Sequence, residues 1–253
     1  MRKKNKKINA AIIIIGNEIL SGRTVDQNVS YLASWLNSSV GIKLEEVRII
    51  PDVQSIIVKT VLSLSKTYNY VFTTGGIGPT HDDITSKSIS RAFKKKYSYN
   101  RDAYKILKKY YGKKDFNGPR KKMAKMPEGS KLIYNPSSAA PGFMIKNVLC
   151  LPGVPSILKS MSVNIKKLLK PGTKLFNSII TVSTVESHIA KPIEKVQKKY
   201  KTAVEIGSYP FFRQGKVGVS IVMRGERIKK LQSCHNDIIK ILRKKNLKIY
   251  RGN

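Results

Sequence analysis

The sequence predicts an α/β protein: a larger domain built on a mostly parallel sheet, then a small α/β domain. Continuous apolar runs at residues 10–15 and 70–72 are typical of parallel strands that are covered on both faces. Patterns of helical spacing separate these runs, and strand–helix–strand alternation favours parallel crossovers. Lys170-Pro171-Gly172 then marks a boundary, so we expect domains at residues 1–170 and 171–253.

The elements of the first domain follow from apolar spacing and from turn residues. Apolar residues at helical spacing between Val29 and Val40 predict a helix that stops at Gly41. By the same reasoning we expect a strand at 44–50, a helix at 53–64, a strand from residue 70, helices at 102–111 and 119–126, and a strand at 148–151 before a Pro/Gly turn.

The second domain is expected to have the order βαββα. We expect a strand at 179–185, a helix at 189–200, strands at 203–208 and 218–223, and a helix at 228–242. Val219, Ile221 and Met223 alternate with smaller or polar residues, as in a sheet with one better-buried face.

The segment from Thr73 to Thr85 is the strongest functional signal. Gly75, Gly76 and Gly78 allow a sharp turn and bring backbone N–H groups close to a ligand. The following helix start favours phosphate, and Asp82-Asp83 could bind a cation that neutralises it. Such turns also occur without function, and an aspartate at a helix start is often only a cap.

Two further segments place polar residues beside this one. Gly16-Asn17-Glu18 follows the first strand directly, at the edge where open α/β sheets bind their ligands. The segments Asn135–Phe143 and Val148–Pro155 again combine a short apolar strand with a Pro/Gly turn.

Together, residues 12–22, 75–85 and 151–155 resemble the MoaB/Mog-type molybdopterin-binding domain family. The subgroup is that of the amino-terminal domain of competence/damage-inducible protein A (CinA), and eukaryotic FAD synthases carry a related domain. Gly207-Ser208-Tyr209-Pro210 also fits, so the resemblance spans nearly the whole chain. Any one of these segments alone would be a weak signal, whereas their order and spacing are specific.

The resemblance implies a three-layer α/β/α domain that binds a pterin or nucleotide phosphate at the carboxyl edge of its sheet. Members of this subgroup hydrolyse pyrophosphate bonds in ADP-ribose or FAD, giving AMP, with magnesium, manganese or cobalt and often potassium. Association into homo-oligomers is common in such domains. The CinA amidase domain has no counterpart in this sequence, so deamidation of nicotinamide mononucleotide is not implied.

Candidate roles follow for the residues of these motifs. Asp82, Asp83 and Glu18 are the catalytic candidates, and the same three together with Asp26 are the metal-ligand candidates. Asn28 could bind a ribose or phosphate oxygen, or cap its helix. The other expected ligand-binding residues are Gly75, Gly76, Gly78, Thr80, Thr85, Asn135, Gly142, Pro152 and Gly153. For Thr80 and Thr85, helix capping is the alternative.

Four basic residues near these motifs are weaker candidates for the site. His81 lies in the glycine loop and could act as a general base, although a single exposed histidine is more often incidental. Arg120, Lys121 and Lys122 could reach a phosphate, but on base rates they belong to the surface.

Two departures from the family pattern favour a second hypothesis, a non-catalytic pterin- or nucleotide-binding protein of molybdenum cofactor metabolism. Asn17 stands where many relatives have aspartate, and an amide is a weaker cation ligand than a carboxylate. Ser156-Ile157 also lacks the acidic residue that often follows the last Pro-Gly turn.

Composition limits the other classes. The net charge is +34, but the basic excess is spread evenly along the chain and is mostly lysine, which favours a solvated surface over nucleic-acid binding. Two cysteines, Cys150 and Cys234, are too few for a disulfide framework. Neither a membrane span nor a secretory signal is recognisable, so we expect a cytoplasmic protein.

Overall fold

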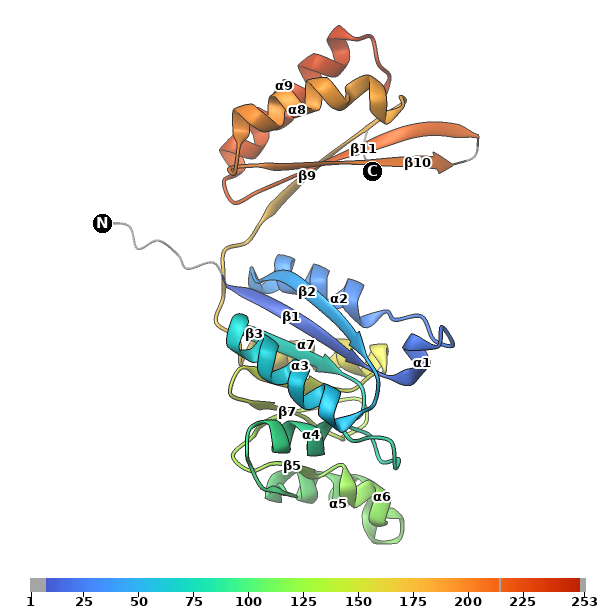
Figure 1. Ribbon diagram of the computed structural model, residues 1–253, viewed down its shortest axis with the longest axis vertical. Helices are drawn as coiled ribbons and strands as arrows, with labels where there is room; N and C mark the ends of the chain where they lie inside the picture. The colour runs from blue at the N-terminus through green and yellow to red at the C-terminus, as the bar shows by residue number, and fades with distance from the viewer. Residues whose placement is uncertain (1–7, 214, 251–253) are drawn as a thin grey trace, which may run out of the picture. The chain divides into compact units, whose positions relative to one another are not determined.

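The computed structural model describes residues 8–213 and 215–250, and the basic segment at the N-terminus lies outside this range. The chain divides into two compact units, with the division between Gly172 and Thr173 (Figure 1). No helix in the described ranges is long and apolar enough to cross a membrane.

The first unit is built on a six-stranded sheet with the strand order β2-β1-β3-β8-β7-β6. The first four of these strands run parallel, and β7 and β6 continue the sheet antiparallel. The six strands are β1 (Asn9–Ile15), β2 (Lys43–Ile50), β3 (Tyr70–Thr74), β6 (Lys131–Ile133), β7 (Gly142–Ile145) and β8 (Val148–Leu151). The expected mostly parallel sheet is confirmed.

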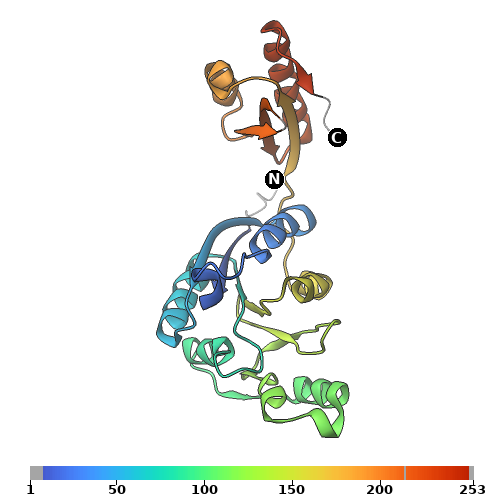
Figure 2. The ribbon, with the colours of Figure 1, turned by 90° about the vertical axis from the view of Figure 1, so that its right-hand side faces the viewer.

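Helices cover both faces of this sheet and make the expected three layers. Figure 2 shows α3 and α4 on one side and α2 and α7 on the other. The helices of the unit are α1 (Asn17–Leu20), α2 (Asn28–Trp35), α3 (Gln54–Thr67), α4 (Thr85–Ala92), α5 (Arg101–Asp115), α6 (Gly118–Lys122) and α7 (Pro155–Lys166). A π-helical turn, η1 (Leu36–Val40), extends α2 and ends at Gly41, which has a φ of 76°.

The core of the first unit consists of two apolar clusters, one on each face of the sheet. Alternate residues of β1 divide between them: Ile13 and Ile15 pack toward α3, whereas Ile12 and Ile14 pack toward α2 and α7. β1 is therefore buried on both faces, as its continuous run of isoleucine predicts.

Residues 119–126 do not form the single helix that the sequence predicts. Asn117 caps α6, with Pro119 in its first turn, and the helix ends at Lys122. The chain then enters a short strand, β5 (Lys125–Pro127), which pairs with β4 (Tyr97–Tyr99). The pairing buries Met126 and places Pro127 outside any helix, where its missing N–H costs nothing.

The second unit has the expected βαββα order, and a two-residue strand adds to it. Its elements are β9 (Phe176–Val182), α8 (Glu186–Tyr200), β10 (Glu205–Arg213), β11 (Lys216–Gly225), α9 (Ile228–Lys244) and β12 (Ile249–Tyr250). The sheet order is β10-β11-β9-β12, all antiparallel, and both helices lie on one face (Figure 1). Val219, Ile221 and Met223 face the helices and are buried, as their alternation predicts.

Candidate active site

The glycine loop after β3 is built from close backbone contacts that only glycine permits. Gly75 has a φ of 99°, and a Cβ at this position would lie 2.1 Å from the carbonyl oxygen of Ile15. Gly76 has a φ of 67°, and its Cβ would lie 2.2 Å from Oγ1 of Thr85. The loop therefore turns tightly across the end of β1 and returns to the start of α4.

The N-terminal end of α4 is open to an anion. Ile84 occupies the capping position, and no side chain of the described residues bonds the amides there. The Thr85 hydroxyl is fully buried and has no hydrogen-bond partner in the ranges that the structure covers. The Thr85 N–H already donates to the Gly76 carbonyl oxygen at 2.9 Å, so the next amides of α4 and the unpaired hydroxyl are the groups that a phosphate oxygen could satisfy.

Asp82 and Asp83 lie in the loop before α4, which begins at Thr85. Asp83 accepts a hydrogen bond from the Thr80 N–H at 2.8 Å and another from the Thr80 hydroxyl. Thr80 thus holds the loop and does not cap α4. A hydrogen bond from Thr80 and one from the backbone also keep the pKa of Asp82 below its ordinary value.

Asp52 is a site residue that the motifs did not identify. It follows β2 directly, and its Oδ2 accepts a hydrogen bond from the Asn17 N–H at 2.9 Å. Burial is the main cause that raises the pKa of the Asp52 carboxyl. The negative charges of Glu18, Asp82 and Asp83 raise the pKa further, so the four carboxylates share one region.

These four carboxylates follow three neighbouring parallel strands. Glu18 follows β1, Asp52 follows β2, and the aspartate pair follows β3. The carboxyl ends of β2, β1 and β3 are adjacent in the sheet, and Figure 1 shows α1 and the loop before α4 at this same end. The sequence signal for Asp52 is its place just beyond a parallel strand, the same signal that selected Glu18.

Of the expected metal ligands, Glu18, Asp82 and Asp83 belong to the acidic region, whereas Asp26 has a structural role. Asp26 accepts a hydrogen bond from the Val29 N–H at 2.8 Å and so caps α2. In the described chain, no group of three or more histidine, cysteine, aspartate or glutamate residues is arranged to hold a metal ion. The acidic region thus offers negative potential and separate carboxylates, and a complete set of protein ligands is not assembled there.

Asn28 joins two of the expected site segments. Its Nδ2 donates to the Gly153 carbonyl oxygen at 2.7 Å, whereas its buried Oδ1 has no partner among residues 8–213 and 215–250. Because Asp26 already caps α2, the alternative role of Asn28 as the cap is wrong. Gly153 in turn approaches Gly75 closely, since a Cβ on Gly153 would lie 3.4 Å from the Gly75 Cα.

Asn135 shapes the opposite side of the edge through side-chain hydrogen bonds within its loop, and Gly142 does so through a close approach to β8. Asn135 Nδ2 donates to Ser138 Oγ at 2.7 Å and to the Ala140 carbonyl oxygen at 2.9 Å, and its Oδ1 accepts from two amides of the same loop. A Cβ on Gly142 would lie 2.5 Å from the Cys150 carbonyl oxygen. Pro152 precedes Gly153 in the turn after β8.

Of the three basic residues on α6, Lys122 reaches the glycine loop. Its ammonium donates to the Thr80 carbonyl oxygen, and its charge helps to lower the pKa of Asp82. Arg120 instead stacks on Tyr111, with 4.3 Å from guanidinium carbon to ring centre. His81 is exposed in the same loop.

Two other polar groups of this edge were also missed from the sequence. Thr73 and Thr74 end β3, and both hydroxyls are buried without a hydrogen-bond partner in the described part of the protein. Beside Thr73, on the neighbouring strand β8, burial raises the pKa of the Cys150 thiol to about 12, so that this cysteine stays protonated.

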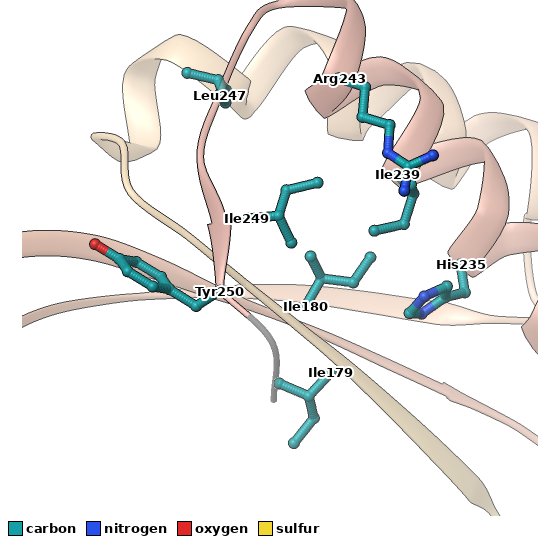
Figure 3. A pocket seen from close by; sticks show the side chains of 8 residues that line it. All are labelled: Ile179, Ile180, His235, Ile239, Arg243, Leu247, Ile249 and Tyr250. Carbon is teal, nitrogen blue, oxygen red and sulfur yellow. The ribbon is translucent and has the colours of Figure 1, made fainter. Parts of the chain in front are cut away.

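A cavity of about 470 Å³ lies in the second unit, away from these motifs in sequence (Figure 3). Its walls are mainly apolar side chains of β9, α9 and β12, with His235 and Arg243 as polar members. None of the site residues expected from the sequence lines this cavity in the described chain.

Comparison with known proteins finds a family match for each of the two units. Residues 11–171 match the family model of a probable molybdopterin binding domain, and residues 174–251 match the middle domain of FAD synthase. A protein of Archaeoglobus fulgidus is 35% identical over 220 residues, which are 87% of this chain and 93% of that one. A CinA-like protein of Chloroherpeton thalassium is 29% identical over 92% of this chain and 58% of its own length.

A solved structure supports the same relationship. The crystal structure of the protein CinA from Thermoplasma acidophilum matches with a TM-score of 0.60 at 31% identity, and covers 64% of this chain and 98% of that one. The expected resemblance is therefore confirmed. This chain belongs to the MoaB/Mog-type molybdopterin-binding domain family, in the CinA-type subgroup, and carries a domain of the FAD synthase middle type after it.

Proposed function

We propose that the first unit hydrolyses the pyrophosphate bond of a nucleotide derivative such as ADP-ribose or FAD and releases AMP. The observation that carries this proposal is the gathering of Asp52, Glu18, Asp82 and Asp83 beside a glycine loop. A phosphate-binding loop alone fits many ligands. Four carboxylates next to it would repel a phosphate unless a cation lies between them, which is the requirement of metal-assisted phosphate chemistry.

The phosphate is expected to bind at the open start of α4. Amides of the first turn beyond Thr85 and the unpaired Thr85 hydroxyl would donate to its oxygens, with Gly75 and Gly76 keeping the backbone close. Asn28 Oδ1, buried and unpaired among the described residues, could accept from a ribose hydroxyl or a pterin N–H. This part of the proposal applies equally to a pterin phosphate.

The acidic region fits a divalent cation that is shared with the substrate. Magnesium usually binds one or two carboxylates together with substrate phosphates and water, so a complete protein cage is not required. Asp82, Asp83 and Glu18 are the residues that would hold magnesium, manganese or cobalt. A cation bound there would neutralise charge on the pyrophosphate. Asp83 has one oxygen engaged by Thr80, and Asp26 has one engaged by the Val29 N–H at the start of α2, so each offers only its other oxygen to a cation.

Asp52 is the best candidate to accept the proton of the attacking water. Its raised pKa makes it a stronger base than an ordinary aspartate, and the Asn17 N–H holds its orientation. The oxygen of water bonds to one phosphorus as the bridging P–O bond breaks. The products are AMP and ribose 5-phosphate from ADP-ribose, or AMP and FMN from FAD.

A non-catalytic pterin or nucleotide carrier is the second candidate, and Asn17 favours it. The residue stands at the site edge with its N–H bonded to Asp52, but it brings an amide where a carboxylate would strengthen cation binding. Such a protein would hold its ligand through the same loop and would make no product.

Incubation of the purified chain with ADP-ribose or FAD tests the proposal. The buffer contains potassium with magnesium, manganese or cobalt, and chromatography measures AMP. We expect AMP only with a divalent cation, and a loss of roughly 10²–10⁴-fold in Asp52→Asn, because a general base contributes about that much. Asparagine retains the acceptor for the Asn17 N–H, so the fold is disturbed little.

Asp115→Asn is the matched control, since this carboxylate lies on the exposed end of α5 and should leave the rate unchanged. Absence of AMP with every cation, from protein shown to be folded, would refute the hydrolase. Calorimetric titration with ADP-ribose, FAD and a pterin would then identify a carrier.

A further inference from the structure

The outer side of β2 is a free sheet edge. β2 is the first strand in the order of the six-stranded sheet, and no strand of the described chain pairs with its outer side. Val47 and Ile49 are 38% and 45% exposed there, opposite the buried Ile12 and Ile14 in register. An edge that combines open backbone groups with apolar side chains is a template for another strand.

The hydrogen bonds to β1 show which backbone groups of β2 point outward. The Gly16 N–H donates to the Ile50 carbonyl oxygen at 3.2 Å, so Ile50 faces β1. Because backbone groups alternate along a strand, Arg48 also faces β1 and Val47 and Ile49 face out. The register shifts at Glu45, which lies between the partners of Ala10 and Ala11, so the regular outer edge is residues 46–50.

The charges on this edge alternate in sign. Arg48 Nε donates to Glu46 Oε1 at 2.6 Å, and the Tyr68 hydroxyl donates to Glu46 Oε2 at 2.7 Å. The Tyr68 bond and then the Arg48 bond lower the pKa of Glu46, so this carboxylate stays ionised. The terminal nitrogens of Arg48 have no partner among the described residues and remain able to bind a second carboxylate.

We propose that β2 pairs antiparallel with β2 of a second copy of this chain, about a two-fold axis at Val47. Val47 then lies opposite its own counterpart, and the two residues exchange N–H···O bonds in both directions. Glu46 of each copy lies opposite Arg48 of the other. Each guanidinium therefore lies between two carboxylates, and the two six-stranded sheets become continuous.

The other symmetric registers of this edge are less favourable. An axis at Glu46 would place the two glutamates opposite each other, and an axis at Arg48 would do the same with the arginines. With an axis at Ile49, Glu46 of one copy would no longer lie opposite Arg48 of the other. The pairing does not involve Glu18, Asp52, Asp82 or Asp83, so it is independent of the proposed function.

Sedimentation velocity of the full chain over a wide concentration range tests the proposal. We expect a dimer whose dissociation constant rises at least tenfold, about 1.4 kcal/mol, in Val47→Pro, because proline removes the central N–H donors. This N–H faces away from β1, so the substitution spares the sheet itself. Val47→Thr is the matched control, since it has a similar shape and keeps the N–H, and it should remain dimeric.

Charge variants provide a second test that does not depend on proline. Arg48→Glu should weaken the dimer by a similar factor, and the double variant Glu46→Arg/Arg48→Glu should restore it, because the charges again alternate across the axis. The fluorescence of Trp35, the single tryptophan, reports whether each variant is folded. A wild-type monomer at every concentration, or a dimer that folded Arg48→Glu leaves unchanged, would overturn the proposal.

Discussion

Replacing Gly75 with alanine should destabilise the first unit far more than the same change at Gly22. Both glycines have positive φ values, 99° at Gly75 and 73° at Gly22. A Cβ on Gly22 would meet no described atom within 4 Å, whereas a Cβ on Gly75 would lie 2.1 Å from the Ile15 carbonyl oxygen. The pair therefore separates backbone strain from steric overlap at the candidate site.

The expected magnitudes follow from these two contributions. Left-handed backbone costs an L-residue about 1–2 kcal/mol, which is the whole effect expected for Gly22→Ala. At Gly75 the end of β1 must also move, and overpacking of this kind typically costs about 1–3 kcal/mol more. We therefore expect a loss of roughly 2–5 kcal/mol in Gly75→Ala, with weaker ligand binding because the loop shifts.

Urea denaturation followed by tryptophan fluorescence measures these losses in the first unit alone. The single tryptophan, Trp35, lies on α2 and packs against the core of this unit. With a slope of about 2 kcal/mol per molar urea, the midpoint should fall by roughly 1–2.5 M in Gly75→Ala and by about 0.5–1 M in Gly22→Ala. Equal shifts in the two variants would refute the reasoning, because strain alone would then account for both.

Three other substitutions have defined outcomes. Asp52→Asn should stabilise the first unit at pH 7 by less than about 1 kcal/mol. Because the pKa of Asp52 is raised in the folded state, the wild-type protein loses stability as pH rises, so the gain should fade as pH falls toward 3.8. Thermal melting followed by fluorescence at each pH tests this. Asn28→Ala removes the bond to Gly153 and should cost about 1–3 kcal/mol in urea, whereas Ser34→Ala, at an exposed position of the same helix, should cost little. In the second unit, Asp237 accepts hydrogen bonds from Lys199 at 2.7 Å and from Tyr200 at 2.8 Å, and these two bonds, that of Lys199 first, lower the pKa of its carboxyl. Asp237→Asn should therefore cost less than about 1 kcal/mol at pH 7, because solvent screens this carboxylate, and nothing at a pH well below 3.8. Scanning calorimetry of the second unit measures this loss, and a difference that persists in acid would contradict the prediction.

The sheet and the glycine loop could be predicted because their signals are local. A run of four isoleucines can be buried on both faces only in a central strand, and β1 is such a strand. Gly75 and Gly76 both have positive φ values, as a sharp phosphate-type turn requires. The sequence also indicated the alternation in β11, since one face of that strand is buried against two helices.

Other features depend on contacts between distant segments and were missed for that reason. Burial and, after it, the charges of Glu18, Asp82 and Asp83 raise the pKa of Asp52, and these three carboxylates lie far from Asp52 in the sequence. The end of α6 is set by the pairing of β5 with β4, which overrides a helical pattern. A carboxylate just before a helix can be either a metal ligand or a helix cap, and the sequence does not distinguish the two roles. One oxygen of Asp26 caps α2 in the structure.

The order of strands in the first unit has a consequence for protein synthesis. Thr73 pairs with Ile13 on one side and with Cys150 on the other, so neighbouring strands come from distant parts of the chain. The hydrogen bond from Asn28 to the Gly153 carbonyl oxygen likewise joins two segments that are distant in the sequence. A nascent chain therefore cannot complete the candidate site until residues beyond Gly153 have left the ribosome. Until then its apolar strands lack their partners, and such non-local pairing is slow and leaves apolar surface open to aggregation.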